Sequence, residues 1–101
     1  MDWKSKISLE LSRIRKNDNP GKVRTTARRI VGIALEQLYT SPGNDFIKLL
    51  HRASDDRSLP ESVQNAAGRL GARLTPDFQS PSSDPLGDAK IIVDYVQKHT
   101  S

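Results

Sequence analysis

Residues 23–38 have the apolar spacing of a long α-helix with one buried face. No other stretch of the chain is as long or as regular. The apolar positions are Val23, Ala27, Ile30, Val31, Ala34, Leu35 and Leu38. Most of the stability of such a helix comes from packing its apolar face against other parts of the protein. We therefore expect the rest of the chain to be arranged around this helix.

The chain is long enough for one domain with a modest core. Its 101 residues match the usual length of a single domain, and a chain of this size buries roughly 65% of its unfolded surface. Apolar residues make up 35% of the sequence and aromatic residues 5%, so the core must be thin and aliphatic. The sequence has no cysteine, which excludes disulfide bonds and thiolate metal sites.

The sequence contains no apolar run that indicates export or membrane insertion. Residues 1–13, MDWKSKISLELSR, lack the apolar segment of a signal peptide. Nowhere does the chain hold the run of about eighteen apolar residues that a transmembrane helix needs. We therefore expect a cytoplasmic protein.

Helical spacing predicts an element before the central helix. Residues 3–16 place four apolar side chains on one face, and residues 17–21 then break the helix with turn-forming chemistry. The face consists of Trp3, Ile7, Leu11 and Ile14. Asn19 is suited to cap the central helix, with Pro20 as its first residue. A connection this short makes the two helices antiparallel neighbours.

Two further helices are predicted in the middle of the chain. The first covers residues 46–54. The sequence Ser58-Leu59-Pro60-Glu61 then has the pattern of a capping box, with the Ser58 hydroxyl as N-cap. The helix that follows has an apolar face up to position 74, but Gly68 and Gly71 each cost it about 1 kcal/mol. We interpret these glycines as signs of a frayed or early-ending helix rather than of close helix packing.

The last third of the chain divides into a linker and a final helix. Residues 75–85 are rich in Pro and Ser and predict a flexible linker. Asp84 is suited to cap the segment 86–99. The run from Ile91 to Val93 favours a strand by propensity, but a lone strand would have no partner, so we predict a helix. The expected fold is a single all-α domain over residues 1–101: a small four-helix bundle at 3–74 and a fifth, C-terminal helix.

Positive charge is concentrated in the first third of the sequence. Residues 1–29 hold nine Lys or Arg and three Asp or Glu, whereas residues 30–101 hold seven and nine. The basic pole predicted from the antiparallel first two helices consists of Arg13, Arg15, Lys16, Lys22, Arg24, Arg28 and Arg29. Such asymmetry points to an anionic partner, which could be nucleic acid, an acidic protein surface or anionic lipid. The alternative is a solvated basic face that only keeps the protein soluble.

Bases in the first turns of the central helix oppose its dipole. This costs a few tenths of a kcal/mol for each base, and the sequence offers no local benefit in return. We therefore read Arg24 and Arg28 as residues kept for an anionic partner. On this reading, replacing both by Gln leaves thermal stability unchanged or slightly higher.

Residues that could support catalysis or metal binding are sparse. His51 and Asp55 share a helix face, but a metal site normally needs three or four ligands. The sequence has no G-x-S-x-G, P-loop or G-x-G-x-x-G motif, and its serines cluster in turns and cap positions. We therefore predict no enzymatic activity, no metal and no cofactor.

The third and fourth predicted helices have the lengths of a helix-turn-helix. Gln64, Asn65 and Arg69 could then read bases and form a secondary candidate face. Acidic residues at the end that would enter the groove, Asp55 and Asp56 among them, oppose this reading because phosphates repel them. The function predicted from sequence is a small non-enzymatic binding or regulatory protein whose basic pole engages nucleic acid. The alternative is a protein-interaction module of the antidote or adaptor type, which binds a partner protein through helix faces.

Overall fold

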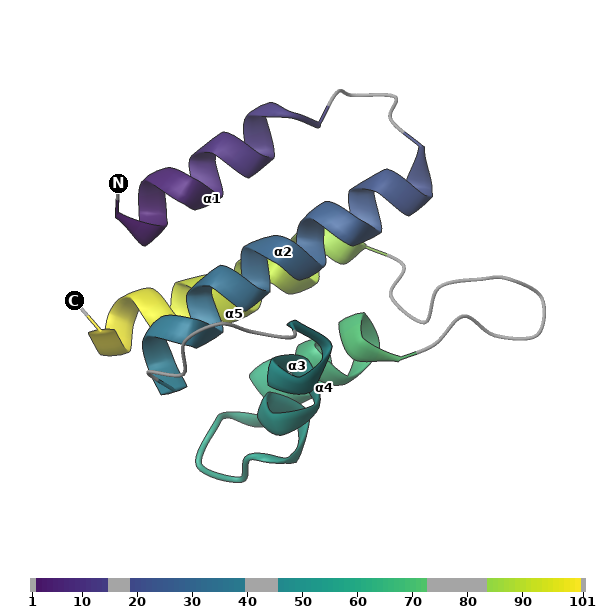
Figure 1. Cartoon of the computed structure of the whole chain (residues 1–101). Helices are drawn as coiled ribbons and strands as arrows, with labels where there is room; N and C mark the ends of the chain where they lie inside the picture. Colours follow the sequence, from purple (N-terminus) through teal and green to yellow (C-terminus); the bar gives the residue numbers. More distant parts are fainter. Residues whose placement is uncertain (1, 15–18, 40–45, 73–83, 101) are drawn as a thin grey trace.

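The computed structural model describes residues 2–14, 19–39, 46–72 and 84–100, and within these ranges it contains five α-helices and no strand. Figure 1 shows the helices packed around the second of them. They are α1 (Trp3–Ser12), α2 (Pro20–Tyr39), α3 (Phe46–Asp55), α4 (Glu61–Gly71) and α5 (Pro85–Thr100). The predicted all-α fold class is confirmed.

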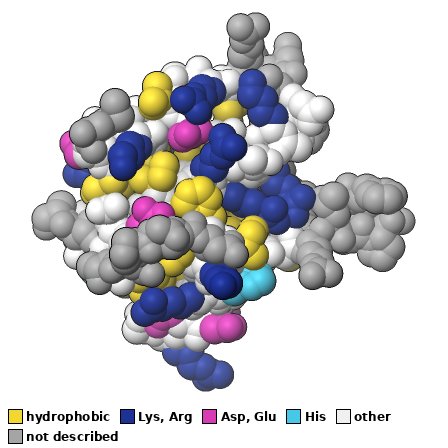
Figure 2. Space-filling view, in the orientation of Figure 1, with side chains coloured by type: hydrophobic (Ala, Val, Ile, Leu, Met, Phe, Trp, Pro, Cys, Tyr) yellow, Lys and Arg dark blue, Asp and Glu magenta, His cyan; other side chains and the backbone are white. Residues whose placement is uncertain are grey.

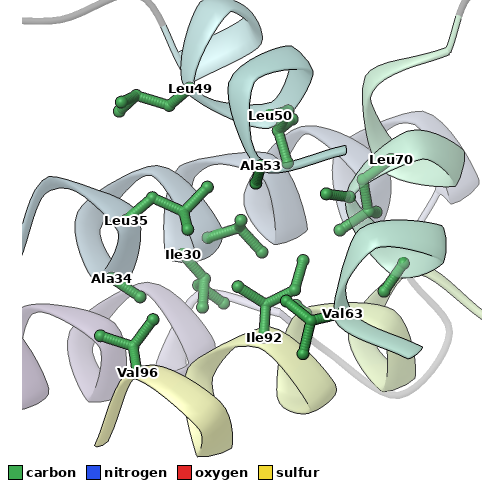
Figure 3. Packing of buried hydrophobic residues seen from close by; sticks show 14 of the residues in the cluster. Ile30, Ala34, Leu35, Leu49, Leu50, Ala53, Val63, Leu70, Ile92 and Val96 are labelled. Carbon is green, nitrogen blue, oxygen red and sulfur yellow. The ribbon is translucent and has the colours of Figure 1, made fainter. Parts of the chain in front are cut away.

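Helix α2 is the centre of the fold, as its apolar spacing predicts. Ala27, Val31, Ala34 and Leu35 have no exposed surface. Full burial of an aliphatic side chain as large as Leu35 contributes about 1.5–3 kcal/mol. Figure 3 shows side chains of α2, α3, α4 and α5 converging in one core.

Helix α5 lies along α2 and completes the core (Figure 1). Its buried apolar side chains are Ala89, Ile92 and Val96. The predicted cap is present, because the Gly87 amide donates to Asp84 Oδ1 at 3.0 Å. The prediction of a helix over 86–99 is confirmed, and the segment belongs to the core rather than to the periphery. The part of the predicted linker at 75–83 lies outside the described residues.

Helix α1 is shorter than predicted and packs on α2 alone. It runs antiparallel to α2, and the Gly21 amide donates to Asn19 Oδ1 at 2.7 Å, which confirms the predicted cap (Figure 1). Of the predicted apolar face only Ile7 is buried, and Leu11 is 45% exposed. The helix ends at Ser12, with Arg13 as its C-cap.

Helices α3 and α4 pack against each other, and Leu50 and Leu70 are fully buried. The predicted capping box between them is wrong. The Ser58 hydroxyl and amide both donate to Asp56 Oδ1, at 2.6 and 2.9 Å, and α4 begins at Glu61 with Pro60 in the N-cap position. Asp56 competes for Ser58 because an Asx turn satisfies the backbone locally.

Two glycines allow close contacts between helices. A Cβ on Gly32 of α2 would overlap the ring of Phe46 on α3. A Cβ on Gly71 would lie 3.2 Å from Leu50 Cβ. Helix α4 does end early, at Gly71, as the sequence suggests. The interpretation that excluded close packing at this glycine is wrong, because α3 occupies the space.

Candidate functional site

Two arginines of the predicted basic pole cap the C-terminus of α4. Arg28 donates from Nε to the Leu70 carbonyl at 2.6 Å and from Nη2 to the Ala72 carbonyl at 3.1 Å. Arg24 donates from Nη2 to the same Ala72 oxygen at 2.9 Å. The last carbonyls of a helix have no partner within the helix, and cationic donors there also complement its dipole. The expectation that these arginines have no local structural benefit is therefore wrong.

The same corner receives a third donor group. His51 Nε2 on α3 lies 3.3 Å from the Gly71 carbonyl, so it donates a hydrogen bond when that nitrogen carries the proton. We name the three side chains Arg24, Arg28 and His51 the α4 cap. No local pattern predicts this cap, because the acceptors of the two arginines are backbone oxygens 42 to 48 positions away along the chain.

The two guanidiniums keep their positive charge without a carboxylate partner among the described residues. Both side chains are half-buried. Burial, followed by the positive charge of Arg24, lowers the pKa of Arg28. The Nε atom of Arg24 is buried and has no hydrogen-bond acceptor in the described part of the chain. The corner is thus electropositive and has unused donor capacity.

The other predicted basic residues are distributed around this corner. Lys22 and Arg29 of α2 are exposed. Arg13 is also exposed, and its Nη1 lies 3.4 Å from Glu10 Oε1. Figure 1 places the end of α1 and the start of α2 at the same end of the molecule, and Figure 2 shows several Lys and Arg side chains on the face in view, with acidic side chains among them. Arg15 and Lys16 lie outside the described residues.

The secondary candidate face is largely engaged in holding the fold together. Gln64 Nε2 donates to the carbonyls of Asp56 and Leu59, both at 2.9 Å. Arg69 forms a bidentate ion pair with Asp88 of α5, in which Nε donates to Oδ2 at 3.0 Å and Nη2 donates to Oδ1 at 2.7 Å. The hydrogen bond to Asp88 raises the pKa of Arg69. Asn65 is exposed.

The surface beside Asn65 is polar and partly acidic. An open hollow of about 680 Å³ lies there. It is lined by Ser54, Asp55, Arg57, Glu61, Gln64 and Asn65. The two carboxylates disfavour a nucleic-acid backbone at this point. Base reading by the face remains a prediction from the sequence.

An apolar groove of about 360 Å³ lies between α1 and α5, and α2 also contributes to its lining. Its lining consists of Ile7, Leu11, Ile30, Leu86, Ala89, Lys90 and Val93. Leu11 contributes to it while remaining 45% exposed. Sequence reasoning placed Leu11 on a buried face and therefore missed the groove.

The described residues hold no group of three or more His, Cys, Asp or Glu side chains suited to a metal ion. None of the described helices is long and apolar enough to cross a membrane. No protein-family model, curated protein or solved structure matches the chain. The function proposed below is therefore argued from the geometry and charge of the site itself.

Proposed function

We propose that this protein is a small non-enzymatic binding module that engages the phosphate backbone of nucleic acid through the basic surface of α2. The binding surface consists of Lys22, Arg24, Arg28 and Arg29. Contacts to phosphates carry no sequence information, so binding is weak, with a dissociation constant of about micromolar or higher, and insensitive to sequence.

The observation that carries this proposal is that Arg24 and Arg28 have no carboxylate partner among the described residues. A half-buried guanidinium pair normally has a carboxylate partner, because desolvation of two like charges is costly. In the described part of the chain these guanidiniums contact only backbone carbonyls. A polyanion supplies the negative charge that the surroundings do not.

The proposal is tested by titrating labelled duplex and single-stranded oligonucleotides at several salt concentrations. The variant Lys22→Gln/Arg29→Gln removes two exposed charges without touching the α4 cap. We expect it to weaken binding and to reduce the slope of log K against log salt by up to about 2. Absence of binding by the wild type at low salt would overturn the proposal.

A matched control removes two charges at the other end of the molecule. Lys4 on α1 and Lys98 on α5 are exposed and lie at the opposite end from the start of α2 (Figure 1). Lys4→Gln/Lys98→Gln changes the net charge equally and should leave most of the affinity intact. Equal losses in the two double variants would indicate attraction to net charge without a defined surface.

The apolar groove favours a second candidate function, binding of a partner protein through helix faces. An exposed Leu11 in the lining of a groove of about 360 Å³ is typical of a surface that an apolar side chain can enter. Such binding depends little on salt, whereas phosphate binding weakens steeply with it. This second function would be supported if the wild type bound a partner protein with an affinity independent of salt and a Leu11→Ser variant lost that binding while keeping its helicity.

A further inference from the structure

Arg24 and Arg28 are held side by side by a shared acceptor. Both Nη2 atoms donate to the carbonyl oxygen of Ala72, at 2.9 and 3.1 Å. Their spacing of four residues on α2 places them on the same helix face. The capping contacts therefore hold the two guanidinium groups within a few ångströms of each other.

The charge at this corner remains positive after capping. The C-terminus of α4 offers about half an elementary negative charge against two full positive charges. The ion pairs identified among the described residues, Arg13 with Glu10 and Arg69 with Asp88, involve neither arginine. An anion at this corner is therefore attracted even though the helix end itself is negative.

Donors are also left over after capping. Each guanidinium carries five N–H bonds, and the three capping hydrogen bonds use only part of this set. The donors left for a ligand are the remaining Nη hydrogens of the two guanidiniums, because the unpartnered Nε of Arg24 is buried. Two guanidiniums with spare donors suit an anion whose oxygens project in several directions.

We infer that Arg24 and Arg28 together bind one phosphate group. The tetrahedral oxygens of a phosphate can accept from two guanidinium planes at once, whereas the two oxygens of a carboxylate lie in one plane. This inference deepens the proposed function and rests on it, because the phosphate belongs to the nucleic-acid backbone. Free inorganic phosphate carries the same chemistry and occupies the same site.

The site can be observed through the Nε–Hε signals of arginine in NMR spectra. The full-length protein is titrated with sodium phosphate, and separately with sodium chloride at equal ionic strength and pH. We expect the Arg24 and Arg28 signals to shift with phosphate in a saturable manner. The exposed Arg57, which lies between α3 and α4 and outside the proposed binding surface, should respond equally to both salts. Parallel shifts of all arginines, or no phosphate-specific shift, would overturn the inference.

A variant that keeps the charge tests the geometry. Arg24→Lys retains a cation at the corner but loses the planar fork, so we expect phosphate affinity to fall about tenfold. Arg57→Lys makes the same chemical change at an exposed arginine outside the proposed binding surface and should leave phosphate affinity unchanged. The helical circular dichroism of each variant establishes that it is folded. Equal phosphate affinity in folded Arg24→Lys and wild type would contradict the two-arginine site.

Titration with an oligonucleotide separates this inference from the proposed function. A saturable phosphate shift without oligonucleotide binding supports the phosphate site and overturns the nucleic-acid function. Oligonucleotide binding without any change at the Arg24 and Arg28 signals supports the function and overturns the site. Competition of inorganic phosphate with the oligonucleotide supports both.

Discussion

The Nε atom of Arg28 donates a 2.6 Å hydrogen bond to the carbonyl oxygen of Leu70. This contact joins the basic half of α2 to the last turn of α4. It gives the arginine a structural role that does not require a ligand. Basic residues on a helix surface can therefore be retained for capping, for binding, or for both.

We predict that Arg28→Gln lowers stability. The substitution removes the donor to the Leu70 carbonyl, whereas the Ala72 carbonyl keeps its hydrogen bond from Arg24; an unsatisfied carbonyl costs about 1–3 kcal/mol. For a domain of this size each kcal/mol corresponds to about 4–8 °C in the midpoint of thermal unfolding. Arg29→Gln is the control, because Arg29 is exposed and outside the cap. A midpoint for Arg28→Gln as high as that of the control would show that the capping contacts contribute nothing.

We predict opposite effects of alanine at two helical glycines. Gly32→Ala forces a methyl group against the ring of Phe46 and should destabilise the protein by about 1–3 kcal/mol. Gly68→Ala meets only Ser54 Cβ at 3.7 Å, an ordinary contact, and should stabilise by about 0.5–1 kcal/mol through helix propensity. Urea unfolding measures both. A Gly32→Ala variant as stable as wild type would contradict the close packing of α2 on α3, and a destabilising Gly68→Ala would contradict the open surroundings of Gly68.

Local patterns in the sequence were enough to predict the helices. The apolar stripe of α2 and the caps at Asn19 and Asp84 depend on residues within a few positions of one another, so they can be read directly. The capping box failed because Asp56, two residues before Ser58, offers a stronger local acceptor. The helix before α2 ends at Ser12, earlier than predicted, and the next two side chains, Arg13 and Ile14, are not buried.

The candidate site could be predicted only in part. Charge counting found Arg24 and Arg28, but their acceptors on α4 depend on how distant helices pack. The sequence also did not predict the hydrogen bond from the Tyr39 hydroxyl to Asp56 Oδ2, at 2.8 Å, because it too depends on how separate elements pack. Burial raises the pKa of Tyr39, and its hydrogen bond to Asp56 raises it further, so this tyrosine acts as a donor.

We predict that Asp56 makes stability depend on acid pH. Hydrogen bonds from Ser58, and then from Tyr39, lower the pKa of Asp56 below its ordinary value of 3.8. A carboxyl whose pKa is lower when folded contributes stability that is present above the unfolded value and lost as pH falls through the folded value. The free energy of unfolding should therefore decrease less in Asp56→Asn than in wild type as the pH falls from 6 to about 2.5. An identical pH profile would contradict these contacts, and Asp94→Asn, at an exposed position, is the control.

We predict that the core depends on Leu35. This side chain has no exposed surface, so Leu35→Ala should cost about 2–5 kcal/mol and Leu35→Asp should abolish helical circular dichroism. Leu9 is 46% exposed, and Leu9→Ala should change stability by less than about 0.5 kcal/mol. A fully helical Leu35→Asp variant would remove α2 from the centre of the fold.

The most direct test of the account is to map the binding surface with backbone amide NMR signals during titration with a short duplex oligonucleotide at low salt. We predict that the perturbed amides cluster in the first turns of α2, around Arg24 and Arg28, and near the end of α4 at Gly71 and Ala72. Raising the salt concentration should reverse these shifts. Perturbations confined to the apolar groove around Leu11, or no perturbation at low salt, would contradict the account.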